Sequence, residues 1–222
     1  MLVNHDFTRR AKRVPAEYDW IHSPQAGVDR VMLDRIGGEK ARATSLVRYY
    51  PNSDFPEHQH PDGEEILVLS GTFSEAGKDY PAGWYLRNPP DSQHQPSSKE
   101  GALIFVKLRQ MNRGFQDYVR LDTNDTANWV EQPYGARCPL FENEFEKVDL
   151  VRLNPGEEML VTGAEILLLQ GELRNGGETE MTGTWIRLPY HESLLLHAAE
   201  AGAVFYRKTG DIQVISPIEE KA

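Results

Sequence analysis

Histidine and glutamate residues spaced like metal ligands occur in the segment FPEHQHPDGEEILVLSG, residues 55–71. His58 and His60 are two positions apart, so their side chains would point to the same face of a β-strand. The PDG sequence at 61–63 has the composition of a tight turn, because proline presets one backbone dihedral and glycine accepts positive φ. The chain would reverse there and bring Glu64 beside His60. This arrangement predicts metal chemistry on a β-hairpin.

Glu64 would share one strand face with the apolar residues Ile66 and Val68. No residue near it in the sequence supplies a countercharge on that face. A buried carboxylate is costly unless it is paired or bound to a metal ion. Glu64 is therefore the carboxylate that we expect at such a centre, whereas Glu65 would point away from it.

A further histidine follows in the segment GWYLRNPPDSQH, residues 83–94. Its proline pair, Pro89 and Pro90, opens a turn just before His94. Together the two segments read His-x-His-x3-Glu-x6-Gly and then Gly-x5-Pro-x4-His.

This double pattern resembles the two motifs of the cupin superfamily. Over roughly residues 20–110, the chain is similar in sequence to the cupin domain of ChrR-type anti-sigma factors, most clearly in the segments GEEILVLSGTF and YPAGWYLRNPPDSQH. The resemblance implies a jelly-roll barrel, also called a double-stranded β-helix, that holds one divalent metal ion per chain. By the same likeness, the metal ligands are His58, His60, Glu64 and His94.

Three imidazoles and one carboxylate suit zinc, which we expect first, and also Fe, Mn or Ni. If all four groups bind zinc in a tetrahedron, the site is closed. If the metal is octahedral, two positions stay open for a substrate or O2. Asp91 takes a place at which cupins usually have glycine. Because a turn accepts aspartate, we expect a changed loop and an intact site.

Short apolar runs interrupted by glycine and proline recur along the chain and predict an all-β protein. The chain also contains an internal repeat. EEILVLSG at 64–71 matches AEILLLQG at 164–171, and GWYLRNP at 83–89 matches GTWIRLP at 183–189, both with an offset of 100. We therefore expect two tandem cupin domains.

The repeat predicts an N-terminal arm at 1–19, a metal-binding cupin at 20–115 and a degenerate, metal-free cupin at 116–222. In the second copy, Ala164 and Leu194 replace the glutamate and the second-motif histidine, and GEEMLVTG replaces the His-x-His hairpin. The second cupin would then be a structural partner of the first. Two fused cupins could satisfy each other's exposed faces as a monomer or form a further homodimer, and the sequence leaves both open.

The composition of the chain indicates which classes of binding partner to expect. The net charge of −10 over 222 residues argues against nucleic acid, because proteins that bind it usually carry a basic face. No apolar run approaches the roughly 18–20 residues needed to cross a bilayer, so we expect no membrane partner and a cytoplasmic location. Cys138 is the single cysteine, which rules out an internal disulfide and a Cys-x-x-Cys zinc motif.

Two functions fit these features. The ChrR resemblance implies a sensor or regulatory module of oxidative-stress transcription control, in which a helical zinc-binding domain before the cupin holds a sigma factor inactive. Residues 1–19 cannot form that domain, so we expect no direct sigma-factor binding. The alternative is a mononuclear metal-dependent cupin enzyme of the dioxygenase type that acts on a small organic molecule, with catalytic residues unknown. A third reading, an incidental metal in a scaffold protein, predicts a filled coordination shell and no pocket.

Overall fold

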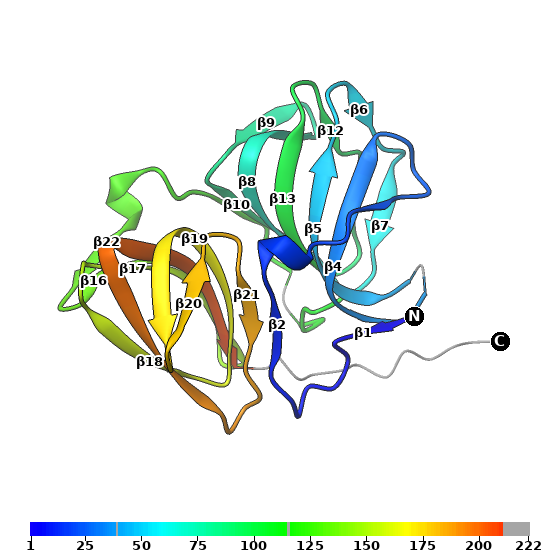
Figure 1. Ribbon diagram of the computed structural model, residues 1–222. Coiled ribbons are helices and arrows are strands. Elements are labelled where there is room, and N and C mark those ends of the chain that lie inside the picture. Colours follow the sequence, from blue (N-terminus) through cyan, green and yellow to red (C-terminus); the bar gives the residue numbers. More distant parts are fainter. Residues whose placement is uncertain (39, 115, 211–222) are drawn as a thin grey trace. The chain divides into compact units, whose positions relative to one another are not determined.

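The computed structural model describes residues 1–38, 40–114 and 116–210 (Figure 1). In this part of the chain the regular structure is β-strand, apart from two short 3₁₀ turns, η1 (Pro15–Glu17) and η2 (Thr126–Asn128). No helix in the described ranges is long and apolar enough to span a membrane.

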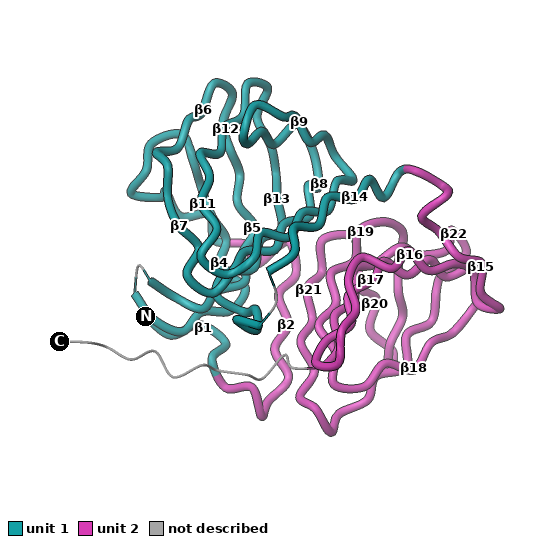
Figure 2. The backbone as a smooth tube through the Cα atoms, turned by 180° about the vertical axis from the view of Figure 1, so that it is seen from behind, with its two compact units in different colours: residues 1–5, 19–124, 214–222 teal, residues 6–18, 125–213 magenta. Residues whose placement is uncertain are grey.

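The chain divides into two compact units (Figure 2). Unit 1 contains Met1–His5 and Asp19–Asn124. Unit 2 contains Asp6–Tyr18 and, of the described residues, those from 125 to 210. The units are described separately below.

Unit 1 is built on an antiparallel sheet of 11 strands among its described residues. The main path of hydrogen-bonded neighbours is β1 (Leu2–Val3), β4 (Val28–Ile36), β5 (Arg42–Tyr49), β13 (Ala102–Leu108), β8 (Glu64–Glu75), β10 (Trp84–Asn88) and β14 (Val119–Asp122). The attached short strands are β3 (Ile21–His22), β6 (Ser53–Asp54), β9 (Lys78–Pro81) and β12 (Ser97–Ser98). A separate two-stranded sheet pairs β7 (His58–His60) with β11 (Ser92–His94).

Unit 2 repeats this architecture with nine strands in its described part. The main path is β15 (Val130–Gln132), β16 (Gly135–Glu142), β17 (Glu146–Leu153), β22 (Ser193–Gly210), β19 (Ala164–Asn175), β21 (Trp185–Arg187) and β2 (Ala11–Arg13). The attached strands are β18 (Glu158–Thr162), which pairs with β22, and β20 (Glu178–Met181), which pairs with β19.

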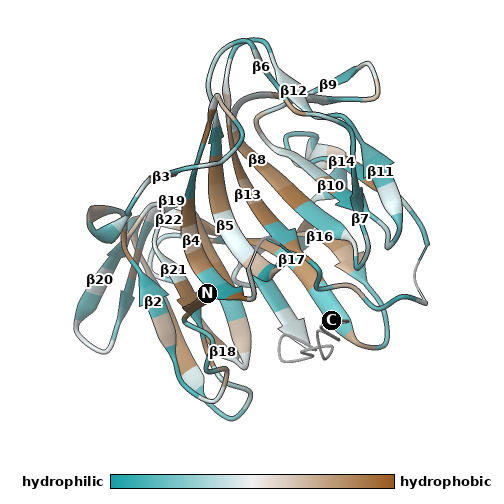
Figure 3. Ribbon diagram, turned by 90° about the vertical axis from the view of Figure 1, so that its right-hand side faces the viewer, coloured by the Kyte–Doolittle hydropathy of each residue, from teal (hydrophilic) through white to brown (hydrophobic). Residues whose placement is uncertain are grey.

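The core of unit 1 follows from strand alternation. Ile66 and Val68 on β8 pack with Ile104 and Val106 on β13, and register places these residues opposite one another. Figure 3 shows hydrophobic residues along β4, β8 and β13, whereas β7 and β11 are hydrophilic. The two polar strands that carry the predicted histidines therefore lie in the same unit as this apolar sheet.

The internal repeat is visible in the backbone. Strands β8 and β19 each have 12 residues, and their bounds differ by 100 positions. Gly71 and Gly171 have φ of +70° and +77°, and a Cβ at either would overlap the carbonyl oxygen of Gly101 or Gly202, respectively. Only glycine accepts this combination of positive φ and close backbone approach. The repeated sequence thus preserves one strand geometry in both units.

The segment that precedes each repeat belongs to the sheet of the other unit. Strand β2, within the 1–19 segment that we expected to form a separate arm, pairs with β21 in unit 2. Strand β14, which we assigned to the second cupin, pairs with β10 in unit 1. The unit boundary therefore lies at 124/125 instead of 115/116. Backbone pairing at a sheet edge produces this exchange, and the repeat alignment carries no signal for it.

Candidate metal centre

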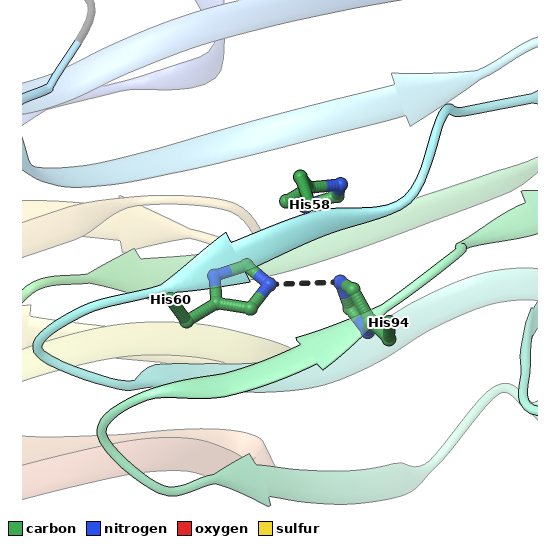
Figure 4. Close-up of side chains that lie close together, drawn as sticks. All are labelled: His58, His60 and His94. Carbon is green, nitrogen blue, oxygen red and sulfur yellow. Dashed lines mark hydrogen bonds between the residues drawn. The ribbon is translucent and has the colours of Figure 1, made fainter.

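Three histidines converge on the two-stranded sheet of unit 1 (Figure 4). Antiparallel register places His58 opposite His94, with His60 two residues further along β7. The Nε2 atoms of His60 and His94 are 2.9 Å apart. One ring nitrogen from each of the three histidines lies within 4.8 Å of the others. His60 and His94 are buried and His58 is partly exposed, so the cluster lies between the interior and the solvent.

Glu64 completes the set that the sequence predicted. Its Oε2 atom is 3.4 Å from His60 Nε2 and 3.5 Å from His94 Nε2. The side-chain amide of Asn88, on the neighbouring strand β10, donates to the same Oε2 at 2.9 Å. The structure therefore brings Glu64 to two of the three predicted histidine ligands.

Hydrogen bonds at the far side of the rings orient two of the histidines. His58 Nδ1 is 3.0 Å from the carbonyl oxygen of Pro56, which can only accept, so Nδ1 carries the proton. His94 Nδ1 donates to the carboxylate of Glu75. In a neutral ring with a protonated Nδ1, the lone pair is on Nε2, the atom directed into the cluster. Such outer partners are typical of metal-binding histidines.

The nitrogen spacing fits a metal ion. Two nitrogens that each lie about 2.1 Å from one ion are about 3.0 Å apart at a right angle and about 3.4 Å apart at the tetrahedral angle. The 2.9 Å between His60 Nε2 and His94 Nε2 corresponds to the right-angled case. Glu64 Oε2, at 3.4 Å and 3.5 Å from these two nitrogens, corresponds to the tetrahedral case. The donor types and their spacing therefore suit a divalent metal ion in either geometry.

Burial and charge act differently on these groups. Burial lowers the pKa of His60, with the charge of Glu64 opposing it. Burial acts most strongly on His94 and would lower its pKa, but the hydrogen bond to Glu75 and the charges of Glu64 and Glu75 together outweigh it and raise the pKa. For Glu75, burial acts to raise the pKa, and the contacts with His94 and Arg120 outweigh it and lower the pKa. Glu75 is thus a carboxylate anion that holds one ligand in place.

A cavity of about 480 Å³ opens next to the cluster. His58, His60 and Glu64 form part of its wall. The opposite lining includes apolar residues from β5 and β13, among them Val47 and Ile104. Pockets of this size and composition are typical of small-molecule sites.

Solved structures share this architecture over most of the chain. Bacterial pirin YhhW from Escherichia coli, in complex with nickel(II), has a TM-score of 0.67 and 12% identity and covers 91% of this chain and 99% of its own. YlbA from E. coli has a TM-score of 0.69 and 18% identity over 91% of both chains. Oxalate decarboxylase from Bacillus subtilis has a TM-score of 0.59 and 12% identity over 90% of this chain and 76% of its own. At these identities, the likeness shows the fold alone.

The sequence of residues 9–112 matches the family model of the ChrR cupin-like domain. Residues 9–112 belong to the cupin superfamily, and the solved structures extend the likeness in fold over most of the chain. The predicted all-β fold of two tandem cupins is confirmed, because the structural neighbours are bicupins. No curated protein sequence matches the chain significantly.

Asp91 shows how this cupin keeps its loop without the usual glycine. Its φ is +66°, in the left-handed region that glycine adopts at no cost. Aspartate is among the few other residues that tolerate this conformation. The Asp91 amide donates to the carbonyl oxygen of His60 at 2.8 Å, which ties the loop to a predicted ligand.

The second cupin has apolar side chains at the corresponding places. Leu194 pairs with Val161 across β22 and β18, as His94 pairs with His58 in unit 1. Both residues and Ala164 belong to the buried apolar cluster of unit 2. Among all residues described, the three histidines of unit 1 are the one group of His, Cys or acidic side chains spaced to share an ion. His197 instead forms a hydrogen bond of 2.9 Å with Glu158 at the surface.

Sequence reasoning missed the residues behind the ligands. Glu75 and Arg120 form a buried ion pair, and Arg120 also donates to the side chain of Asn88 at 2.6 Å. Arg120 lies on β14, which we had assigned to the second cupin. Glu75 gave no signal in the sequence, because it follows Glu64 by 11 positions and regular strand alternation would place the two carboxylates on opposite faces. By contrast, Glu65 is buried and pairs with Arg87 on β10 at 3.3 Å.

Proposed function

We propose that this chain is a mononuclear metal-dependent cupin enzyme of the dioxygenase type that acts on a small organic molecule. The observation that carries the proposal is the cavity of about 480 Å³ whose wall contains His58, His60 and Glu64. A scaffold or a closed structural clamp needs no such space beside its ligands. A cavity that reaches the ligands gives an organic molecule access to the metal.

In this proposal His58, His60, His94 and Glu64 hold one divalent ion. When bound, the ion would act as a Lewis acid that polarises an enolate or carboxylate oxygen. The cavity whose wall contains His58, His60 and Glu64 supports access of a substrate or O2 to this ion. Glu75 fixes the orientation of the His94 ring through its Nδ1 proton.

Tyr49 and the apolar wall would shape the rest of the site. Tyr49 lines the cavity from β5 and is buried. Burial raises its pKa, and the charges of Glu64 and Glu75 add to this, so its phenol stays protonated. The neighbouring Phe55 and Val106 are also in the lining, and they would exclude water around a bound organic molecule.

Elemental analysis of protein purified without exposure to nickel resin is the first test, read as moles of each metal per chain. The protein is then reloaded with Fe, Mn, Ni or Zn and screened for oxygen consumption with diketones, flavonoids and keto acids. A Co²⁺-substituted sample titrated with azide tests for open positions directly. We expect about one metal per chain and a visible spectrum that responds to azide. A spectrum that no added anion changes would mean a closed shell and would overturn the proposal.

A second candidate is a sensor-like regulatory module, and the match of residues 9–112 to the ChrR cupin-like domain favours it. In this case the centre would bind zinc as a clamp, and the cavity would hold a signal molecule without turnover. About one zinc per chain, together with no oxygen consumption in any metal form, would support this candidate over the enzyme.

A further inference from the structure

The cavity beside the centre carries an excess of positive charge. Four cationic side chains line it, and Glu64 is the one acidic group among its described lining residues. The cations are Arg30, Arg35, Lys40 and Arg109. Because the whole chain has a net charge of −10, this local excess runs against the general composition.

Of these four cations, Arg30, Arg35 and Lys40 form no ion pair with a described carboxylate. Arg30 donates to the hydroxyl of Ser23 at 2.8 Å, and Arg35 donates to the carbonyl oxygen of Gly38. No carboxylate of a described residue forms an ion pair with either guanidinium. Arg35 is only 6% exposed, and burial together with the charge of Arg30 lowers its pKa. A buried arginine is rarely left unpaired.

By contrast, Arg109 already has a carboxylate partner. Its guanidinium lies 3.6 Å from the side chain of Asp62. Lys40 is exposed between β4 and β5, so the unpaired charge that is at least partly buried belongs to Arg30 and Arg35 on β4.

The strand register explains why both arginines line the same cavity. Five positions separate them, which in a regular strand would place them on opposite faces. The pairing of β4 with β5 shifts between Met32 and Asp34, so Arg30 lies opposite Val47 and Arg35 lies opposite Ala43. A β-bulge inserted here re-aims the side chains that follow it.

The same register connects Arg35 to the centre. Ala43 lies opposite Leu108, and Leu108 lies opposite Glu64. Arg35 and Glu64 thus stand at one level of the sheet, three strands apart. This corresponds to about 14 Å along the curved sheet at a spacing of about 4.8 Å per strand. A ligand that spans this distance would have one end at Arg35 and the other at Glu64.

We infer that the cavity of unit 1 binds a small organic carboxylate, whose anionic group is held by Arg30 and Arg35 while its apolar body lies against Val47 and Ile104. Arginine suits this role because its planar donors match the two carboxylate oxygens. The inference rests on the proposed function and deepens it, since it names the substrate class of the same site.

Isothermal titration of the zinc-loaded protein with matched pairs of ligands tests this inference. The probes are straight-chain monocarboxylates of four to eight carbons and phenylacetate, each compared with its uncharged primary amide. For the best-fitting pair we expect the carboxylate to bind about 10- to 100-fold more tightly than the amide, as charge-assisted hydrogen bonds imply. Added salt should reduce the preference. Equal binding of every carboxylate and its amide would overturn the inference.

Substitution then locates the anion site. Arg35→Gln and Arg30→Gln should each reduce the preference for the carboxylate about tenfold or more, with metal content unchanged. Arg48→Gln is the matched control, because Arg48 lies on β5 with its guanidinium over the Trp20 ring, 3.8 Å from the centroid, and does not line the cavity. An equal loss in Arg48→Gln would refute the assignment.

Two further measurements, an unfolding temperature and ligand binding by a metal-site variant, distinguish a misfolded protein or a failed metal centre from a wrong anion site. In the absence of ligand, Arg35→Gln should unfold at the same temperature as the wild type or at a higher one, because the substitution removes an unpaired buried charge. A lower unfolding temperature would indicate that Arg35 already has a partner in the protein and would contradict the inference. In the His94→Ala variant, a retained carboxylate preference would support the anion site even if oxygen consumption is never found. Metal binding with no carboxylate preference would overturn only the anion site.

Discussion

Replacing Glu75 by glutamine tests how the centre is supported. The substitution keeps the volume and one acceptor oxygen but removes the charge that contacts His94 and Arg120. Loss of an outer partner of a metal ligand typically reduces metal affinity about 10- to 100-fold. We expect a loss in this range for Glu75→Gln, because His94 would no longer have an anion behind its Nδ1 proton.

The reduced metal affinity of Glu75→Gln should also reduce the free energy by which bound metal stabilises the folded protein. At a free metal concentration of 100 times the wild-type Kd, binding stabilises the native state by about 2.7 kcal/mol. If the affinity falls 10-fold or 100-fold, the stabilisation at that concentration becomes about 1.4 or about 0.4 kcal/mol. Taking the difference between metal-loaded and metal-free protein for each variant cancels the separate cost of leaving Arg120 with a weaker partner.

Competition with a chromogenic chelator gives the metal affinity, and denaturant unfolding with and without metal gives the stabilisation. Asn175→Ala is the matched control, because Asn175 follows Glu75 by the repeat offset of 100 and bonds Glu180 in unit 2. The control should bind metal like the wild type. If Glu75→Gln also binds metal within twofold of the wild type, the reasoning from the His94 contact is refuted.

Three further predictions concern the ligand set and the repeat. His94→Ala should reduce bound metal severely while unit 2 stays folded, and an unchanged metal content by elemental analysis would contradict the ligand assignment. Leu194→Ala should leave metal content unchanged and cost about 2 to 5 kcal/mol in denaturant unfolding, because it truncates a buried leucine of the unit 2 core. Gly71→Ala and Gly171→Ala should each destabilise their unit by at least about 1 to 2 kcal/mol. Both glycines have positive φ, and the added methyl group would overlap a carbonyl oxygen. A neutral effect at either position in denaturant unfolding would count against the shared geometry.

The grouping of His58, His60 and Glu64 could be predicted from the sequence because its geometry is local, whereas His94, 34 positions after His60, entered only through the cupin resemblance. A strand alternation places His58 and His60 on one face, and a three-residue turn returns Glu64 to them. The outer support could not be found in this way. Glu75 and Arg120 are 45 positions apart and meet only because β14 adds to the edge of β10.

The cavity arginines were hidden for a different reason. Regular alternation from Arg30 would turn Arg35 to the other face, and only the β-bulge between them brings both to the cavity. A bulge in one strand leaves little trace in a single sequence, since it depends on how the partner strand pairs. The fold class and the repeat survive such irregularities because they rest on many strands, whereas the lining of a site depends on one register shift.

The difference between the two cupins follows from what each interior must hold. In unit 2 the ligand places are occupied by Val161, Ala164 and Leu194, which pack into a continuous apolar cluster. In unit 1 the same region holds imidazoles, buried carboxylates and a cavity, each of which contributes less to stability than apolar packing does unless a ligand completes it. Metal binding would therefore stabilise unit 1 directly. For unit 2 we expect no stabilisation by metal, since its described residues at these places form apolar packing.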